Sequence, residues 1–66
     1  MTIFLNGETV ECNEGVTIEG LLKTYHLSLE ATLVEQNGIA LHRHEWVKRK
    51  VQENDRFEIL SVAAGG

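Results

Sequence analysis

Residues 2–12 have the sequence TIFLNGETVEC, in which two short runs of β-forming residues flank an Asn-Gly pair. The two central residues of the tightest hairpin turns need positive φ, and Asn-Gly is a pair that adopts it readily. The stretch therefore predicts an antiparallel hairpin that turns at Asn6-Gly7. Phe4 is left on the face opposite the core. The side chains that alternate toward the expected core are Ile3, Leu5, Val10 and Cys12.

A short amphipathic helix is predicted to follow the hairpin. Thr17 can cap its first turn, and apolar side chains then recur at the i, i+3, i+4 and i+7 positions that form one face of a helix. These side chains are Ile18, Leu21, Leu22 and Tyr25. Gly20 lies inside the segment and costs about 1 kcal/mol relative to Ala, so the helix depends on packing its apolar face against a sheet.

Three more strands are predicted in the rest of the sequence. They span residues 32–36, 39–42 and 56–62. A second Asn-Gly turn, at Asn37-Gly38, joins the first two of them. Residues 43–50 are polar around Trp46 and predict an irregular connection or a single helical turn, with Trp46 fixed to the body. This order of elements predicts an α+β fold with one sheet, covered by the helix on one face and open on the other.

The last strand contributes to both faces of this sheet. Phe57 and Ile59 alternate toward the core, so Leu60 and Val62 face the other way. Together with Phe4 they are expected to form a small apolar patch on the open face. Apolar patches on small domains often mark partner surfaces, although single exposed apolar residues are normal.

Composition limits the classes of function. A chain of 66 residues is one domain, and it buries only about 60% of the surface that it exposes when unfolded, which leaves little room for an internal active site. Ten acidic against six basic residues give a net charge of −4. This charge disfavours nucleic acid as a partner, because affinity for phosphates comes from Lys and Arg. A basic protein surface is a better match.

Cysteine usage and hydropathy predict the compartment. Cys12 is the single cysteine, which excludes an intramolecular disulfide and fits a reducing environment. Met1 is followed by neither a basic segment nor a long apolar one. We therefore expect no signal peptide, no membrane span and a cytoplasmic location.

Residues 61–66, SVAAGG, pass from small side chains to two glycines. At average glycine usage, a Gly-Gly ending arises by chance about once in 200 sequences. Glycine has no β-carbon, so the end of the chain stays narrow. In extended form, residues 63–66 span about 13 Å. We expect a globular body at 1–62 and a flexible tail at 63–66 that carries the α-carboxylate of Gly66 into another protein's active site. The alternative is an inert, frayed end.

Several further features occur in a fixed order along the chain. They are the opening MTIFL, the Asn37-Gly38 turn, the segment Arg43-His44-Glu45-Trp46, the Asn54-Asp55 turn and the final Gly65-Gly66. In this order they resemble the ThiS-type sulfur carrier family of thiazole biosynthesis, and the resemblance runs essentially end to end. It implies the ubiquitin-like β-grasp fold, a mixed sheet of about five strands with one main helix on one face. One departure is His42, which stands where members of that family usually have proline.

The resemblance also implies the chemistry. An E1-like adenylating enzyme of the ThiF type, using ATP and Mg²⁺, would convert the Gly66 carboxylate into an acyl adenylate. Sulfur originating from a cysteine desulfurase would then give a thiocarboxylate, from which a thiazole synthase of the ThiG type would build the thiazole of thiamine. The residues that would enter the partner are Ala63, Ala64 and Gly65. Those that would dock on it are Phe4, Leu60 and Val62. The chain would be a single sulfur carrier domain, a co-substrate rather than an enzyme, with no bound cofactor or metal.

Other signals in the sequence favour ordinary structural roles. Cys12 alternates with core residues and is expected to be a small hydrophobe rather than a reactive thiol. His26, His42 and His44 lack a closing set of ligands at metal-site spacing. The basic run 48–50 is too short to indicate nucleic-acid binding. The alternatives that stay open are a molybdopterin-synthase small subunit, a ubiquitin-like protein modifier and a non-catalytic interaction domain.

Overall fold

A computed structural model gives the structure of residues 1–62. Its strands are β1 (Thr2–Leu5), β2 (Glu8–Glu11), β3 (Thr32–Gln36), β4 (Ile39–Leu41) and β5 (Arg56–Ser61). Its helix is α1 (Ile18–Thr24), and two short 3₁₀ helices are η1 (Leu29–Ala31) and η2 (Arg43–Glu45). Each predicted strand is present, and β4 and β5 end one residue earlier than expected. Of the helices in this part of the chain, none has the length and apolar character needed to cross a membrane.

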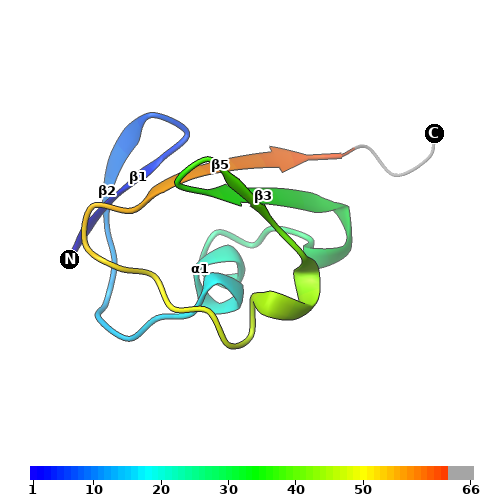
Figure 1. The fold of residues 1–66 in the computed structure, drawn as a ribbon, viewed down its shortest axis with the longest axis horizontal. Helices are drawn as coiled ribbons and strands as arrows, with labels where there is room; N and C mark the ends of the chain where they lie inside the picture. Colours follow the sequence, from blue (N-terminus) through cyan, green and yellow to red (C-terminus); the bar gives the residue numbers. More distant parts are fainter. Residues whose placement is uncertain (63–66) are drawn as a thin grey trace.

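The five strands form one mixed sheet in the order β2-β1-β5-β3-β4. The central strand β5 is parallel to β1, and the other neighbouring pairs are antiparallel. Helix α1 covers one face, and the other face is open (Figure 1). The predicted α+β fold, with a mixed sheet and one helix on one face, is confirmed. The predicted tail at 63–66 lies outside the described residues, so the division into body and tail stays a prediction.

The core lies between α1 and the sheet. Its buried apolar side chains are Ile3, Ile18, Leu21, Leu22, Val34, Trp46, Val51 and Phe57. Leu5, Val10 and Cys12 are partly buried against this cluster, so the core face predicted for the hairpin is confirmed. Trp46 is only 2% exposed, in agreement with its predicted role as a packing anchor. The prediction for Tyr25 was wrong: it is 40% exposed, because α1 ends one residue before it and Tyr25 is the C-cap.

The start of α1 explains why a glycine lies inside the helix. The Thr17 hydroxyl accepts a hydrogen bond from the Gly20 N–H at 3.1 Å, which confirms the predicted N-cap. A β-carbon at Gly20 would lie 3.2 Å from Val16 Cγ2 and 3.4 Å from Thr17 Oγ1. Gly20 therefore lets the capping segment pack close to the helix, which offsets its low helix propensity.

Candidate functional site

Leu60 lies near the end of β5 and is 63% exposed, and Val62, which directly follows the strand, is 45% exposed. Phe4 is on the same open face as Leu60, because it pairs with Arg56 and alternate residues of β5 share a face. Leu60 is four positions farther along β5 than Arg56, which is about 13 Å. The Arg56 guanidinium also lies over the Phe4 ring, 4.5 Å from its centroid. The structure therefore brings Leu60 and Val62 together and places Phe4 apart from them.

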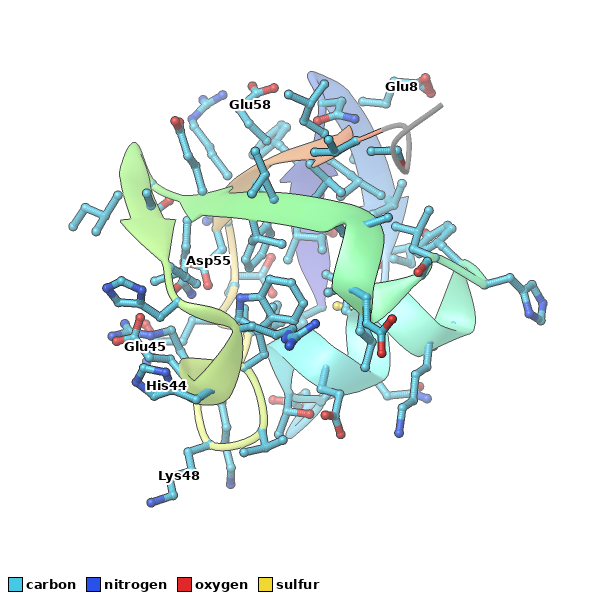
Figure 2. All side chains as sticks on the ribbon, turned by 90° about the vertical axis from the view of Figure 1, so that its right-hand side faces the viewer. Glu8, His44, Glu45, Lys48, Asp55 and Glu58 are labelled. Carbon is cyan, nitrogen blue, oxygen red and sulfur yellow. The ribbon has the colours of Figure 1, made fainter. Side chains whose placement is uncertain are left out.

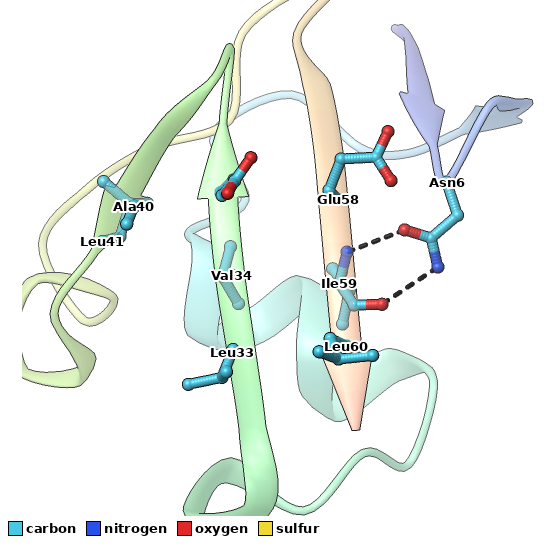
Figure 3. Close-up of a pocket in the computed structure, with 9 residues that line it drawn as sticks. Asn6, Leu33, Val34, Ala40, Leu41, Glu58, Ile59 and Leu60 are labelled. Atoms are coloured by element: carbon cyan, nitrogen blue, oxygen red, sulfur yellow. Dashed lines mark hydrogen bonds between the residues drawn. The ribbon is translucent and has the colours of Figure 1, made fainter. Parts of the chain in front are cut away.

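A neighbour of Leu60 was missing from the predicted patch. Leu33 of β3 lies directly opposite Leu60 in the antiparallel register, and it is 58% exposed. The two side chains lie next to each other on the open face (Figure 3). We call them the leucine pair. Alternation in β3 separates Leu33 from the buried Val34, but no local signal gives the register that sets Leu33 against Leu60.

Next to the leucine pair, the same two strands carry two carboxylates. Glu35 of β3 lies directly opposite Glu58 of β5, and both side chains are exposed. Residues in this relation have Cβ atoms about 4.5–5.5 Å apart. Figure 2 shows Glu58 pointing away from α1, on the open side of the sheet. We call these residues the glutamate pair.

A depression of ≈ 580 Å³ joins the two pairs. Its lining includes the leucine pair, the glutamate pair, Ala40 of β4 and Asn6, which follows β1. One part of the lining is apolar and the adjoining part is acidic. The depression therefore presents apolar and acidic groups side by side on the open face.

Two Asn-Gly turns hold β5 from both sides. Both asparagines and both glycines have positive φ, so the predicted turns are confirmed. The Asn6 amide accepts from the Ile59 N–H at 2.7 Å and donates to the Ile59 carbonyl at 3.1 Å (Figure 3). On the other side, Asn37 Oδ1 accepts from the Arg56 N–H at 2.9 Å. These bonds fix the strand that carries Glu58 and Leu60.

Asp55 was predicted only as a turn residue, but it is the centre of a buried hydrogen-bond network. It is 6% exposed. Its Oδ2 accepts from Gln36 Nε2 and from the Gln52 N–H, each at 2.8 Å, and its Oδ1 accepts from Asn37 Nδ2 at 3.0 Å. A buried carboxylate needs such partners to offset its loss of hydration. The network fixes the point at which β5 begins.

The segment before Trp46 forms η2, which confirms the predicted helical turn. His42 has φ −76° and ψ 145°, which are angles that proline also adopts. Its N–H donates to Glu45 Oε2 at 2.7 Å, and this hydrogen bond is the main cause that lowers the pKa of the Glu45 carboxyl. The rings of His42 and His44 stack with centroids 5.5 Å apart.

The cysteine, the basic run and the histidines, to which the sequence assigned ordinary structural roles, lie in the following environments. Burial raises the pKa of the half-buried Cys12 thiol, so the thiol is less readily ionised. Arg49 of the basic run pairs with Glu45 at 3.7 Å. Within residues 1–62, no group of three or more His, Cys, Asp and Glu side chains is placed to hold a metal ion.

The residues with the most specific predicted roles lie outside the described part of the chain. They are Ala63, Ala64, Gly65 and Gly66. Their entry into a partner, and the activation of the Gly66 carboxylate, stay predictions.

Comparison with known proteins gives one consistent result. The model of the ThiS family matches residues 3–66. The chain is 27% identical over 66 residues to the sulfur carrier protein ThiS of Escherichia coli, and the match covers all of both chains. It is also 35% identical over 66 residues to a thiazole synthase of Magnetococcus marinus, and it spans only 20% of that protein's length.

A solved structure agrees with the sequence matches. The crystal structure of a thiamine biosynthesis protein (ThiS) from Geobacter metallireducens superimposes with a TM-score of 0.85 at 28% identity, and the match covers 100% of each chain. The predicted ubiquitin-like β-grasp fold is therefore confirmed.

Proposed function

The chain belongs to the ThiS family of sulfur carriers, and from that premise we propose that the α-carboxylate of Gly66 is the group that carries the sulfur. The observation that carries the proposal is the extent of the family match, which runs through the final Gly65-Gly66. The structure supports it, because β5 ends at Ser61 and the exposed Val62 is the last residue before the predicted tail.

The chemistry that we propose begins with activation of the carboxylate. A carboxylate resists nucleophilic attack because of its charge and resonance, so one of its oxygens must first attack the α-phosphate of ATP and release pyrophosphate. The terminal sulfur of a persulfide, which originates from a cysteine desulfurase, then attacks the acyl carbon and displaces AMP. A thiol cleaves the resulting acyl disulfide, which leaves a thiocarboxylate on Gly66 and a disulfide between the two thiols. The ATP, the Mg²⁺ and the catalytic groups belong to an adenylating enzyme of the ThiF type. The chain is its co-substrate, in the cytoplasm, where Cys12 stays reduced.

For the recipient of the sulfur we propose a thiazole synthase of the ThiG type. The thiazole synthase of Magnetococcus marinus includes a segment similar to this whole chain. A carrier segment within the same polypeptide as a synthase is held at high effective concentration beside it. A separate carrier needs a docking surface for the same purpose, and we assign that role to Leu60 and Val62, with Phe4 farther along the same face.

Mass spectrometry of the protein from cells that are making thiamine tests the proposal. We expect a fraction of the chains to gain the mass difference between sulfur and oxygen at the C-terminal residue. Adducts on lysines of other proteins would identify a modifier instead. A terminus that is unmodified under every condition would identify an inert interaction domain.

A truncation provides a second test. Deletion of Gly66 should abolish pyrophosphate release by the adenylating enzyme and leave the unfolding transition unchanged, because the residue lies beyond β5. Full activity of that variant would refute the proposal.

A further inference from the structure

The glutamate pair places two negative charges opposite each other on an exposed surface. Glu35 and Glu58 occupy one cross-strand position of β3 and β5. Like charges in this position destabilise a sheet. The free protein would therefore be more stable with neutral residues at these two positions. Folding stability does not explain the two glutamates, whereas binding of a positively charged group would.

The chain does not neutralise this pair within residues 1–62. Ion pairs in this part of the chain join Lys23 to Glu19 and Arg49 to Glu45. The basic side chain nearest in sequence on the same face is Arg56, and it lies over the Phe4 ring. Both carboxylates are thus free to receive a cation from outside.

An apolar contact surface adjoins the two charges. The leucine pair is the next cross-strand pair on the same face toward the end of β5, and its side chains are 58% and 63% exposed. Both pairs line one depression (Figure 3). The surface therefore offers an acidic subsite and an apolar subsite side by side, close to the point where the chain continues toward Gly66.

We propose that this depression binds a protein partner that presents a Lys or Arg side chain next to a bulky apolar one. The cation lies between the carboxylates of Glu35 and Glu58, and the apolar side chain packs on Leu33 and Leu60. The inference rests on the proposed function, since the partner is an enzyme that receives the tail, and it adds the chemistry by which that enzyme recognises the body.

Charge argues against other occupants. A second copy of the chain in the same orientation would bring four carboxylates together, and each copy has a net charge of −4. Nucleic acid would be repelled for the same reason. A basic protein surface is the complementary partner, and opposite charges across an interface raise its rate of association and its specificity.

Binding measurements with the double variant Glu35→Gln/Glu58→Gln test this inference. The matched control is Glu14→Gln/Glu30→Gln, which removes two exposed carboxylates from a turn before α1 and from η1. Each protein is titrated with a ThiF-type and a ThiG-type enzyme by calorimetry at low and high salt. We expect the double substitution to raise the dissociation constant for at least one enzyme about tenfold at low salt. The affinity of the double variant should also depend less on salt than that of the wild type. The control should change by less than about twofold.

Two readouts exclude a structural explanation. The unfolding midpoint of the double variant should equal or exceed that of the wild type, because a repulsion has been removed. Adenylation is measured separately by pyrophosphate release. If the wild type is bound but never adenylated, the proposed function fails, and the dissociation constants still decide the inference.

Three results would overturn the inference. They are equal affinities of the double variant and the wild type, an equal loss in the control, and no binding of the wild type to either enzyme.

Discussion

The Asn6 side chain is hydrogen-bonded to both backbone groups of Ile59, accepting from its N–H at 2.7 Å and donating to its carbonyl at 3.1 Å. It extends the parallel pairing of β1 and β5 beyond Leu5, where β1 ends. Leu60 is the next residue of β5, so this contact helps to fix the strand that presents the leucine pair and the glutamate pair.

Substitution of Asn6 by glycine and by alanine separates the contribution of its side-chain hydrogen bonds to stability from that of its positive φ. Asn6→Gly removes both side-chain hydrogen bonds and should lower the free energy of unfolding by about 1–2 kcal/mol. Asn6→Ala should cost about 1 kcal/mol more, because Asn6 has φ 50° and alanine disfavours that region. Urea denaturation measures both differences. Equal stabilities of the two variants would show that the backbone angle contributes nothing.

Asp55 is expected to be more important for stability than its position in a turn indicates. Asp55→Ala leaves Gln36 Nε2 and the Gln52 N–H without their acceptor and should cost about 3 kcal/mol. Asp55→Asn keeps the shape and part of the accepting capacity, so its loss should be about half as large. Urea denaturation at neutral pH compares the two variants. A loss under about 1 kcal/mol for Asp55→Ala would contradict a central role for the network.

The elements of this fold are predictable because their signals are local. Asn-Gly pairs, strand alternation and the Thr17 cap each depend on a few neighbouring residues, and all were confirmed. Tyr25 fits the helical period but lies outside the core, because α1 ends before it. Gly20 was counted as a cost, although its lack of a side chain allows a close contact.

The functional surface is less predictable because it depends on long-range register. The position of Leu33 beside Leu60, and of Glu35 opposite Glu58, follows from the pairing of β3 with β5. Nothing near either strand in the sequence specifies that pairing. Asp55 shows the same limit, since its partner Gln36 on β3 is brought to it only by the complete sheet.

A charge at Leu60 is expected to impair recognition and leave the fold intact. Leu60 is 63% exposed, so Leu60→Glu should change the free energy of unfolding by no more than about 0.5 kcal/mol. The same variant should weaken binding to the adenylating enzyme about tenfold, because it places a carboxylate on the apolar subsite. Ile39→Glu is the control, since Ile39 is 66% exposed on the edge strand β4. Unchanged affinity of the folded Leu60 variant would refute the docking role.

The departure at His42 allows a test of the hydrogen bond that begins η2. Proline fits the backbone there, because φ is −76° and the preceding residue belongs to a strand, but proline has no N–H to donate to Glu45. That donation is the main cause of the lowered Glu45 pKa, whose ordinary value is 4.5. His42→Pro should therefore raise the Glu45 pKa toward 4.5, as NMR titration of its side chain would show.

The sign of the effect on stability follows from the direction of this shift. Because folding lowers the pKa of Glu45, its contribution is present above the ordinary value of 4.5 and is lost as pH falls through the lowered one. The free energy of unfolding should thus depend less on pH below 4.5 in His42→Pro than in the wild type. His42→Ala retains the N–H and removes the ring, so Glu45 should still titrate low in that variant. If the alanine and proline variants titrate alike, the histidine ring rather than the backbone donor sets the Glu45 pKa.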